Sequence, residues 1–323
     1  MTLAVGPIPA VEFKNTKKIY FPGTKKESVA LKSLNLKVMP GEFFGLLGHN
    51  GAGKSTAIGM MSGTVNITEG DVLIYGHSII TDSTSAKLKL GVVCQELVAD
   101  SFFDLRTMLR LQSKLSGVKP DIYWLDFLLE RLALSGHVKK TTRELSGGMK
   151  RRMMIARALA HKPMMVVLDE PTAGVDVDLR HSMWEFINEL HKTGRTIILT
   201  THYLEEAEAF CQRLAILKNG ELVTLKKREE LMELGGKPMV VARFPEEFSP
   251  ELLQKNLGSF PDAVLSKHQG KYQIGITFNE KDMVSLSNAH GILAQLIQSN
   301  GLAPESMSVQ KPTLEQVFLN LSR

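Results

Sequence analysis

A glycine-rich segment, GHNGAGKST at residues 48–56, has the residue types that bind phosphate. Gly48 and Gly53 lack a Cβ, so backbone N–H groups can converge on phosphate oxygens there. Lys54 can reach the β- and γ-phosphates of a nucleotide, and the Ser55 hydroxyl can ligate Mg²⁺. The segment also lies between an apolar run and the start of a helical pattern. Together, the spacing and the setting predict a phosphate loop.

This loop alone does not decide the class of protein. Kinases, GTPases, motors and transport ATPases can all hold a nucleotide with such a loop. The NKxD-type sequence that gives guanine specificity does not occur in the chain. The other classes stay open at this point.

Two acidic residues, Asp169 and Glu170, directly follow the apolar run MMVVL at residues 164–168. In a sheet of parallel strands, ligands bind beyond the carboxyl ends of the strands. Asp169 is therefore predicted to hold Mg²⁺, through the water shell of the ion. Glu170 is predicted to activate or orient the water that attacks the γ-phosphate.

His202 and Gln95 end two further apolar runs and are expected at the same edge of the sheet. His202 could contact the γ-phosphate or orient the attacking water. Gln95 could ligate Mg²⁺ or sense the nucleotide. A structural role is the usual explanation for a lone residue of either type, and for Gln95 the residue type alone favours it.

A second glycine pair occurs in LSGGMKRR, residues 145–152, at the start of a helical pattern. Ser146 is a favourable N-cap residue, and Gly147 and Gly148 leave the N–H groups of the first turn exposed. The sequence therefore predicts a second helix start that binds anions. A simple kinase has no use for two such sites.

The elements that would position these residues alternate between strands and helices. Short apolar runs at 43–47, 164–168 and 196–200 are typical of fully buried strands. Residues 11–47 have a strand pattern, and residues 97–144 carry apolar side chains at helical spacing, which predicts a helical insertion. Strands alternating with helices predict an α/β fold with parallel pairing.

The pattern changes after a break at residues 235–238, GGKP. From there it reads strand, helix, two strands, helix, strand and a last helix, with the first of these helices at 250–257. That order predicts a small α+β domain of the ferredoxin-like type. We therefore expect two domains, residues 1–236 and 237–323.

The composition excludes several classes of protein. The chain has 323 residues, of which 43% are hydrophobic and 23% charged, as in ordinary globular proteins. It has neither an apolar run of membrane-spanning length nor a signal-peptide pattern, so we expect a cytosolic chain. The net charge of +5 suits a polyanionic ligand or an anionic membrane surface but is too weak for nucleic acid. Cys94 and Cys211 predict neither a disulfide framework nor a zinc site.

These motifs together resemble the ATP-binding subunits of ABC (ATP-binding cassette) transporters, in which LSGG is the signature sequence. The similarity covers residues 11 to about 235. It includes, in the order typical of the family, Tyr20, the loop 48–56, Gln95, the signature at 145–149, Asp169, Glu170, PTAGVD at 171–176 and His202. The terminal segment PTLEQVFLNL, residues 312–321, resembles the type-2 exporter branch.

The resemblance implies roles that composition and spacing do not give. Tyr20 would stack on adenine. Ser146, Gly147 and Gly148 would contact the γ-phosphate of an ATP held by a second subunit, and Asp176 would bridge the interface between the two. The nucleotide would be bound by Tyr20, Gly48, Asn50, Gly51, Ala52, Gly53, Lys54, Ser55, Thr56, Ser146, Gly147, Gly148 and Asp176. Glu170, His202, Lys54 and Gln95 would be catalytic, and Ser55, Gln95 and Asp169 would hold Mg²⁺.

The resemblance also implies a fold and a set of partners. The fold would be an ABC-type P-loop ATPase with an antiparallel β subdomain and a helical subdomain at about 97–160, followed by a regulatory or dimer-supporting α+β domain. Two copies would enclose two ATP molecules at the cytoplasmic face of the cell membrane. The helical subdomain would receive an integral-membrane permease of the type-2 exporter kind.

Two alternatives remain. One is a soluble ABC ATPase that moves no solute, such as an iron–sulfur assembly factor. The other is a binding module with inactive motifs, against which every predicted catalytic position carries the expected residue type.

Overall fold

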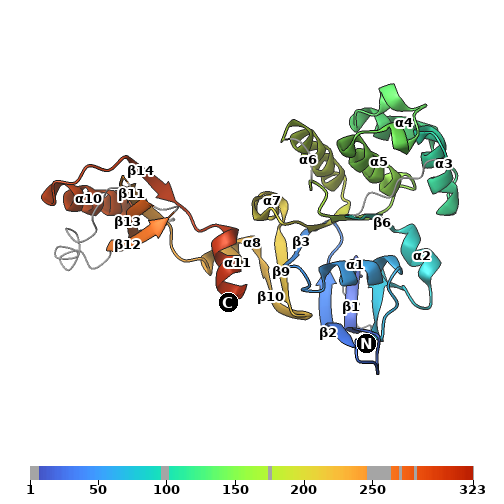
Figure 1. Ribbon diagram of the computed structural model, residues 1–323, viewed down its shortest axis with the longest axis horizontal. Helices are drawn as coiled ribbons and strands as arrows, with labels where there is room; N and C mark the ends of the chain where they lie inside the picture. Colours follow the sequence, from blue (N-terminus) through green and yellow to red (C-terminus); the bar gives the residue numbers. More distant parts are fainter. Residues whose placement is uncertain are drawn as a thin grey trace, which may run out of the picture. The chain divides into compact units, whose positions relative to one another are not determined.

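Two units make up the chain, Met1–Arg228 and Glu229–Arg323. The computed structural model describes residues 7–95, 102–173, 177–245, 263–268, 271–279 and 282–322 (Figure 1). The domain limits expected from the sequence, 1–236 and 237–323, remain a prediction about which parts function separately. Each unit is described by itself.

A six-stranded sheet forms the centre of the first unit, in the order β10-β9-β3-β8-β7-β6. Its strands are β3 (Phe43–Gly48), β6 (Leu90–Val93), β7 (Met165–Asp169), β8 (Thr196–Thr200), β9 (Arg213–Lys218) and β10 (Glu221–Lys227). All neighbouring strands pair in parallel except β9 and β10. Every residue of β7 and β8 is buried, as expected of parallel strands with both faces covered.

A second, antiparallel sheet of the first unit has the order β2-β1-β4-β5. It contains β1 (Val11–Tyr20), β2 (Ser28–Val38), β4 (Glu69–Ile74) and β5 (His77–Ser78). Phe13, Leu36 and Val72 from this sheet share a hydrophobic core with Met60 and Met61 of the helix that follows β3. The structure thus confirms an α/β fold with mixed sheets.

The helices of the first unit are α1 (Lys54–Ser62), α2 (Ser83–Leu88), α3 (Leu105–Leu115), α4 (Ile122–Arg131), α5 (Gly147–Leu159), α6 (Val177–Lys192) and α7 (Leu204–Phe210). Helices α3, α4 and α5 lie together beyond β6 (Figure 1). Two of them begin at aspartate caps: Asp104 accepts a hydrogen bond from Thr107 N at 2.7 Å, and Asp121 accepts one from Trp124 N at 3.1 Å. Among the residues that the structure describes, no helix is both long and apolar enough to span a membrane.

The second unit contains a four-stranded antiparallel sheet in the order β12-β13-β11-β14. Its elements are α8 (Arg228–Glu233), which begins at the last residue of the first unit, β11 (Met239–Arg243), β12 (Ala263–His268), β13 (Lys271–Thr277), α10 (Met283–Ser299), β14 (Ser306–Gln310) and α11 (Leu314–Ser322). Val240 and Ile274 of the sheet share a core with Leu293 and Leu296 of α10. The helix predicted at 250–257 lies outside the described residues, so the ferredoxin-like class stays a prediction.

The helical part of the first unit meets the central sheet at a close approach between α5 and β6. A Cβ built on Gly91 in β6 would lie 2.4 Å from the carbonyl oxygen of Ala158 in α5. That contact is with backbone, which cannot turn aside as a side chain can. Gly91 is therefore required for the packing of α5 on the sheet.

We expect Gly91→Ala to lower the free energy of unfolding of the first unit by about 1–3 kcal/mol, because the added methyl group forces α5 and β6 apart. Thermal unfolding followed by circular dichroism measures the change. Gly136→Ala is the matched control, since a Cβ there meets nothing within 4 Å. Equal unfolding temperatures for the two variants would contradict the predicted contact.

Candidate functional site

The predicted phosphate loop connects β3, which ends at Gly48, to α1, which begins at Lys54. Gly53 precedes the helix with φ of 106°, a conformation that favours glycine. A Cβ on Gly48 would lie 2.5 Å from Leu217 O, and one on Gly53 would lie 2.7 Å from Ala30 O. Both glycines are thus required by the close packing of the loop on neighbouring backbone. Without a side chain, Gly53 leaves the first N–H groups of α1 uncapped for an anion.

Lys54 is only 6% exposed. Its Nζ donates hydrogen bonds to the carbonyl oxygens of Gly48 at 2.6 Å and His49 at 3.2 Å. Burial lowers the pKa of this ammonium group, and the negative charges of Glu170 and Asp169 partly oppose that shift. The lysine is therefore held within the loop and close to the acidic pair.

Tyr20, the last residue of β1, lies beside Thr56 in the first turn of α1. Their hydroxyl oxygens are 3.4 Å apart, and the Nζ of Lys18 lies 4.8 Å from the centroid of the Tyr20 ring. Tyr20 is thus next to the phosphate loop, where the resemblance requires it. Its stacking on adenine stays a prediction.

Glu170 brings three of the predicted catalytic residues together. Its Oε1 pairs with Nε2 of His202, and its Oε2 accepts a hydrogen bond from Nε2 of Gln95 at 2.7 Å. The residue is 8% exposed, whereas the His202 side chain is 48% exposed. Three residues from the ends of three strands therefore meet at one carboxylate, because β7 lies between β8 and β6 in the sheet.

The backbone of Glu170 has φ of 49°, which is unusual for a residue with a side chain. Such a conformation costs of order 1–3 kcal/mol and persists only where the surrounding contacts fix it. Here Glu170 N donates to Thr200 O at 3.0 Å, and Glu170 O accepts from Nη2 of Arg151. Thr200 also donates its hydroxyl hydrogen to Oδ1 of Asp169, which is 6% exposed.

Arg151 and Thr200 contact the residues of this cluster, and neither was predicted from the sequence. Arg151 is 3% exposed, and its Nη1 donates to Cys94 O at 2.6 Å and Gln95 O at 3.1 Å. Burial lowers the pKa of its guanidinium group, and Asp169 and Glu170 partly oppose that shift. One signal was available: Arg151 lies one turn before buried Ile155 and so on the apolar face of its helix.

The signature residues lie at the start of α5. Ser146 caps this helix by accepting a hydrogen bond from Met149 N at 3.4 Å. Ser146 and Gly147 are exposed and Gly148 is half-buried, so these residues are not brought into the Glu170 cluster. Asp176, predicted at the subunit interface, lies outside the described residues.

The remaining predicted residues fit a site for a nucleotide and a hard cation. In the loop, Asn50 and Gly51 are exposed, and Ala52 is buried. The hydroxyl group of Ser55, an exposed residue, and the carboxylate of Asp169 are oxygen donors of the kind that Mg²⁺ prefers. Gln95 uses its amide nitrogen for Glu170, so its oxygen is the atom left to approach a cation.

The comparisons with known proteins agree on one family. The model of the family described as ABC transporter matches residues 31–173. The chain is 34% identical over 321 residues to the linearmycin resistance ATP-binding protein LnrL of Bacillus subtilis (strain 168), covering 97% of this chain and 98% of that protein. It is also 34% identical to the Nod factor export ATP-binding protein I of Rhizobium etli, covering 97% of this chain and 93% of that protein. The dimeric structure of a bacterial ABC transporter cassette is similar with a TM-score of 0.62 and 27% identity, over 68% of this chain and 98% of that one.

We expect Arg151→Met to lower the free energy of unfolding by about 3–5 kcal/mol, because it removes the positive charge near buried Asp169 and Glu170 and leaves three carbonyl groups without their donor. Urea unfolding measures the loss, and amide hydrogen exchange at the ends of β6 and β7 localises it.

Arg152→Met is the matched control on the same helix. Arg152 is half-buried and donates to Leu132 O at 2.8 Å, within the helical part of the unit. Its replacement should cost less and should leave exchange at β6 and β7 unchanged. Equal losses in the two variants would show that Arg151 has no special place in the site.

Proposed function

The chain belongs to the ATP-binding subunits of ABC transporters, and from this premise we propose that it hydrolyses ATP as a homodimer that drives a separate membrane permease of the type-2 exporter branch. One observation carries the proposal: Gln95, Glu170 and His202 meet at the strand ends beside the phosphate loop. Both bacterial relatives named above are ATP-binding proteins, one of resistance and one of export.

The phosphate loop would bind the triphosphate through uncapped N–H groups and through Lys54. The lysine is already aimed at the inner side of the loop by its bonds to Gly48 O and His49 O. Ser55, Asp169 and Gln95 would hold Mg²⁺, which would neutralise charge on the phosphate oxygens when bound. The protein supplies the position and the electrostatic environment, which is most of what phosphoryl transfer requires.

Glu170 would orient the attacking water and accept its proton. Its two oxygens each have one partner, Gln95 or His202, and each keeps a second lone pair to which a water can donate. Gln95 is the partner with a second task, as a candidate ligand of Mg²⁺. His202 is exposed and so is able to contact a γ-phosphate while it remains paired with Glu170.

The exposed start of α5 supports a composite site in a dimer. Ser146 and Gly147 present helix N–H groups to solvent, and such groups bind phosphate oxygens. We propose that they and Gly148 complete the site of the second copy, together with Asp176. The dimeric cassette structure among the relatives supports this arrangement.

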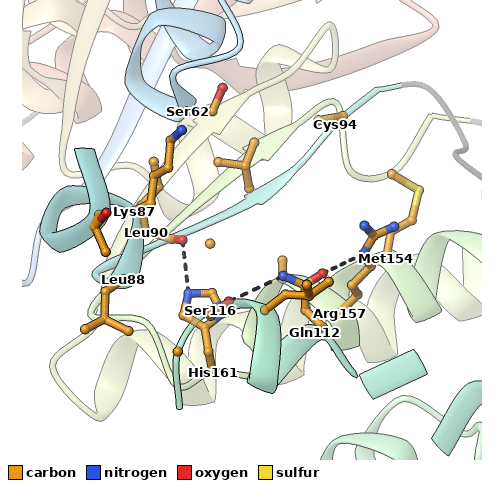
Figure 2. Close-up of a pocket in the computed structure, with 16 residues that line it drawn as sticks. Ser62, Lys87, Leu88, Leu90, Cys94, Gln112, Ser116, Met154, Arg157 and His161 are labelled. Carbon is orange, nitrogen blue, oxygen red and sulfur yellow. Dashed lines mark hydrogen bonds between the residues drawn. The ribbon is translucent and has the colours of Figure 1, made fainter. Parts of the chain in front are cut away.

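A pocket between the helical part and the sheet is the proposed contact with the permease. Its volume is about 590 Å³, and α2 and β6 on one side and α3 and α5 on the other contribute its walls (Figure 2). Apolar Leu88, Leu115 and Met154 line it, beside Arg157, whose Nε donates to Gln112 Oε1 at 2.9 Å. Such a mixed surface suits a helix from the permease, which would place the protein at the cytoplasmic face of the cell membrane.

The second unit is proposed to be the regulatory or dimer-supporting domain. Its strand order, its antiparallel pairing and the packing of α10 on one face support the ferredoxin-like class.

We expect Glu170→Gln to abolish phosphate release while ATP still binds, because the amide fills the same space but cannot accept a proton. In the presence of ATP the closed dimer should then accumulate, and size-exclusion chromatography detects it. Glu130→Gln, an exposed glutamate of α4, is the control. Unchanged hydrolysis in Glu170→Gln would refute the assignment of the base.

We expect subunits carrying Ser146→Arg and subunits carrying Lys54→Ala to be inactive alone and active when mixed. A mixed dimer has one intact composite site and one site damaged twice, so random exchange should restore about a quarter of the wild-type turnover. Activity in either variant alone equal to that of the mixture would count against a shared site.

Co-expression with a candidate permease separates transport from the alternative of a soluble ABC ATPase. A transport subunit should copurify with the permease through the pocket between α2 and α3, and substitutions that fill the pocket should release it.

A further inference from the structure

A buried carboxylate lies close to the Glu170 cluster without belonging to it. Glu206, in the first turn of α7, is 7% exposed. Its Oε1 accepts hydrogen bonds from Thr172 Oγ1 at 2.7 Å and Trp184 Nε1 at 3.2 Å. Its Oε2 accepts one from Thr201 Oγ1 at 2.7 Å. A buried carboxylate is costly, so three donors aimed at it indicate a built arrangement.

Two of the three donors come from the segments that carry the predicted catalytic pair, Glu170 and His202. Thr172 follows Glu170 by two residues, and Thr201 directly precedes His202. Trp184 lies on α6 and stacks on Phe210 of α7 with ring centroids 4.6 Å apart. A single side chain therefore connects the turn after β7, the turn after β8 and helix α6.

The direction of each hydrogen bond is fixed by the charge. An ionised carboxylate only accepts, so both threonine hydroxyl hydrogens must point at Glu206. The oxygen of Thr201 then accepts a hydrogen bond from Tyr203 N at 2.9 Å, which fixes the backbone on both sides of His202. Hydrogen bonds to a charged acceptor are stronger than neutral ones, which makes this turn rigid.

The turn after β7 needs the same support. Glu170 has φ of 49°, and Ala173 N donates to Glu170 O at 3.2 Å, so the chain reverses direction within these residues. Thr172, which is fully buried inside this turn, is anchored by Glu206. The anchor helps to keep Glu170 in a conformation that it would not adopt alone.

We propose that Glu206 is a positioning residue for ATP hydrolysis: its carboxylate fixes the spacing between the turns that carry Glu170 and His202. The inference rests on the proposed function, because those two residues are assigned there. Glu206 acts through Thr172 and Thr201 and does not contact the substrate.

The test is steady-state ATP hydrolysis by Glu206→Gln. The amide has the size of the carboxylate, but its NH₂ group cannot accept a hydrogen bond. One of the three donors therefore loses its acceptor, and one turn loses its anchor. We expect kcat to fall about 10- to 100-fold, because small misplacements of reacting groups cause losses of this size. The KM for ATP should change by less than about threefold. Glu205→Gln, the exposed neighbour on the same turn of α7, is the control and should leave kcat unchanged.

A second series separates positioning from general stability. Thr201→Val keeps the shape but removes the hydroxyl group, whereas Thr201→Ser keeps the hydroxyl group. We expect Thr201→Val to lower kcat and Thr201→Ser to retain most of it. If Glu206→Gln does not fold, this pair of variants still tests whether the hydrogen bond between Thr201 and Glu206 supports catalysis.

A double-mutant cycle with His202→Ala in single-turnover assays gives the decisive readout. If Glu206 acts by fixing the spacing between the two turns, Glu206→Gln should cost clearly less rate once His202 is absent than it costs when His202 is present. Losses that multiply would overturn the inference, as would an unchanged kcat in Glu206→Gln. Turnover that survives in Glu170→Gln would instead refute the proposed function, so the two failures are distinguishable.

Discussion

The site depends on the backbone of Glu170, which turns back at φ of 49° directly after a buried strand. That turn directs the carboxylate of Glu170 to the place where Gln95 and His202 contact it. Without the turn, the side chains at the three strand ends would not meet. The conformation is held by groups from other elements: Thr200 from β8, Arg151 from α5 and, through Thr172, Glu206 from α7. The order of the strands explains why these groups are near, because β7 has β8 on one side and β6 on the other.

Four buried ionisable side chains, Lys54, Arg151, Asp169 and Glu170, are concentrated at this edge of the sheet. Two are cationic and two anionic, and burying any one of them alone would be strongly unfavourable. Both cations donate to backbone carbonyl groups, while their charges act on the acidic pair. This balance lets a mostly apolar sheet end in a charged site, and it makes the loop, the acidic pair and α5 depend on one another.

The sequence allowed the prediction of those site residues that follow an apolar run or a glycine pattern. Lys54, Asp169, Glu170 and His202 stand at or just beyond the end of a strand or a loop, so chain position alone indicates where they lie. Arg151, Thr200 and Glu206 could not be found in this way, because their partners are backbone groups or side chains distant in sequence. Strands β9 and β10 were also not predicted, although Asn219 and Gly220, both at positive φ, form the Asn-Gly turn typical of a tight hairpin.

The hydrogen bonds of Lys54 to Gly48 O and His49 O have a consequence for affinity. A free lysine side chain loses about 1.5–2 kcal/mol of rotational entropy when it is immobilised. In this protein that loss occurs during folding, so an arriving polyanion finds the ammonium group already ordered. Preorganisation of this kind raises affinity without adding a single contact.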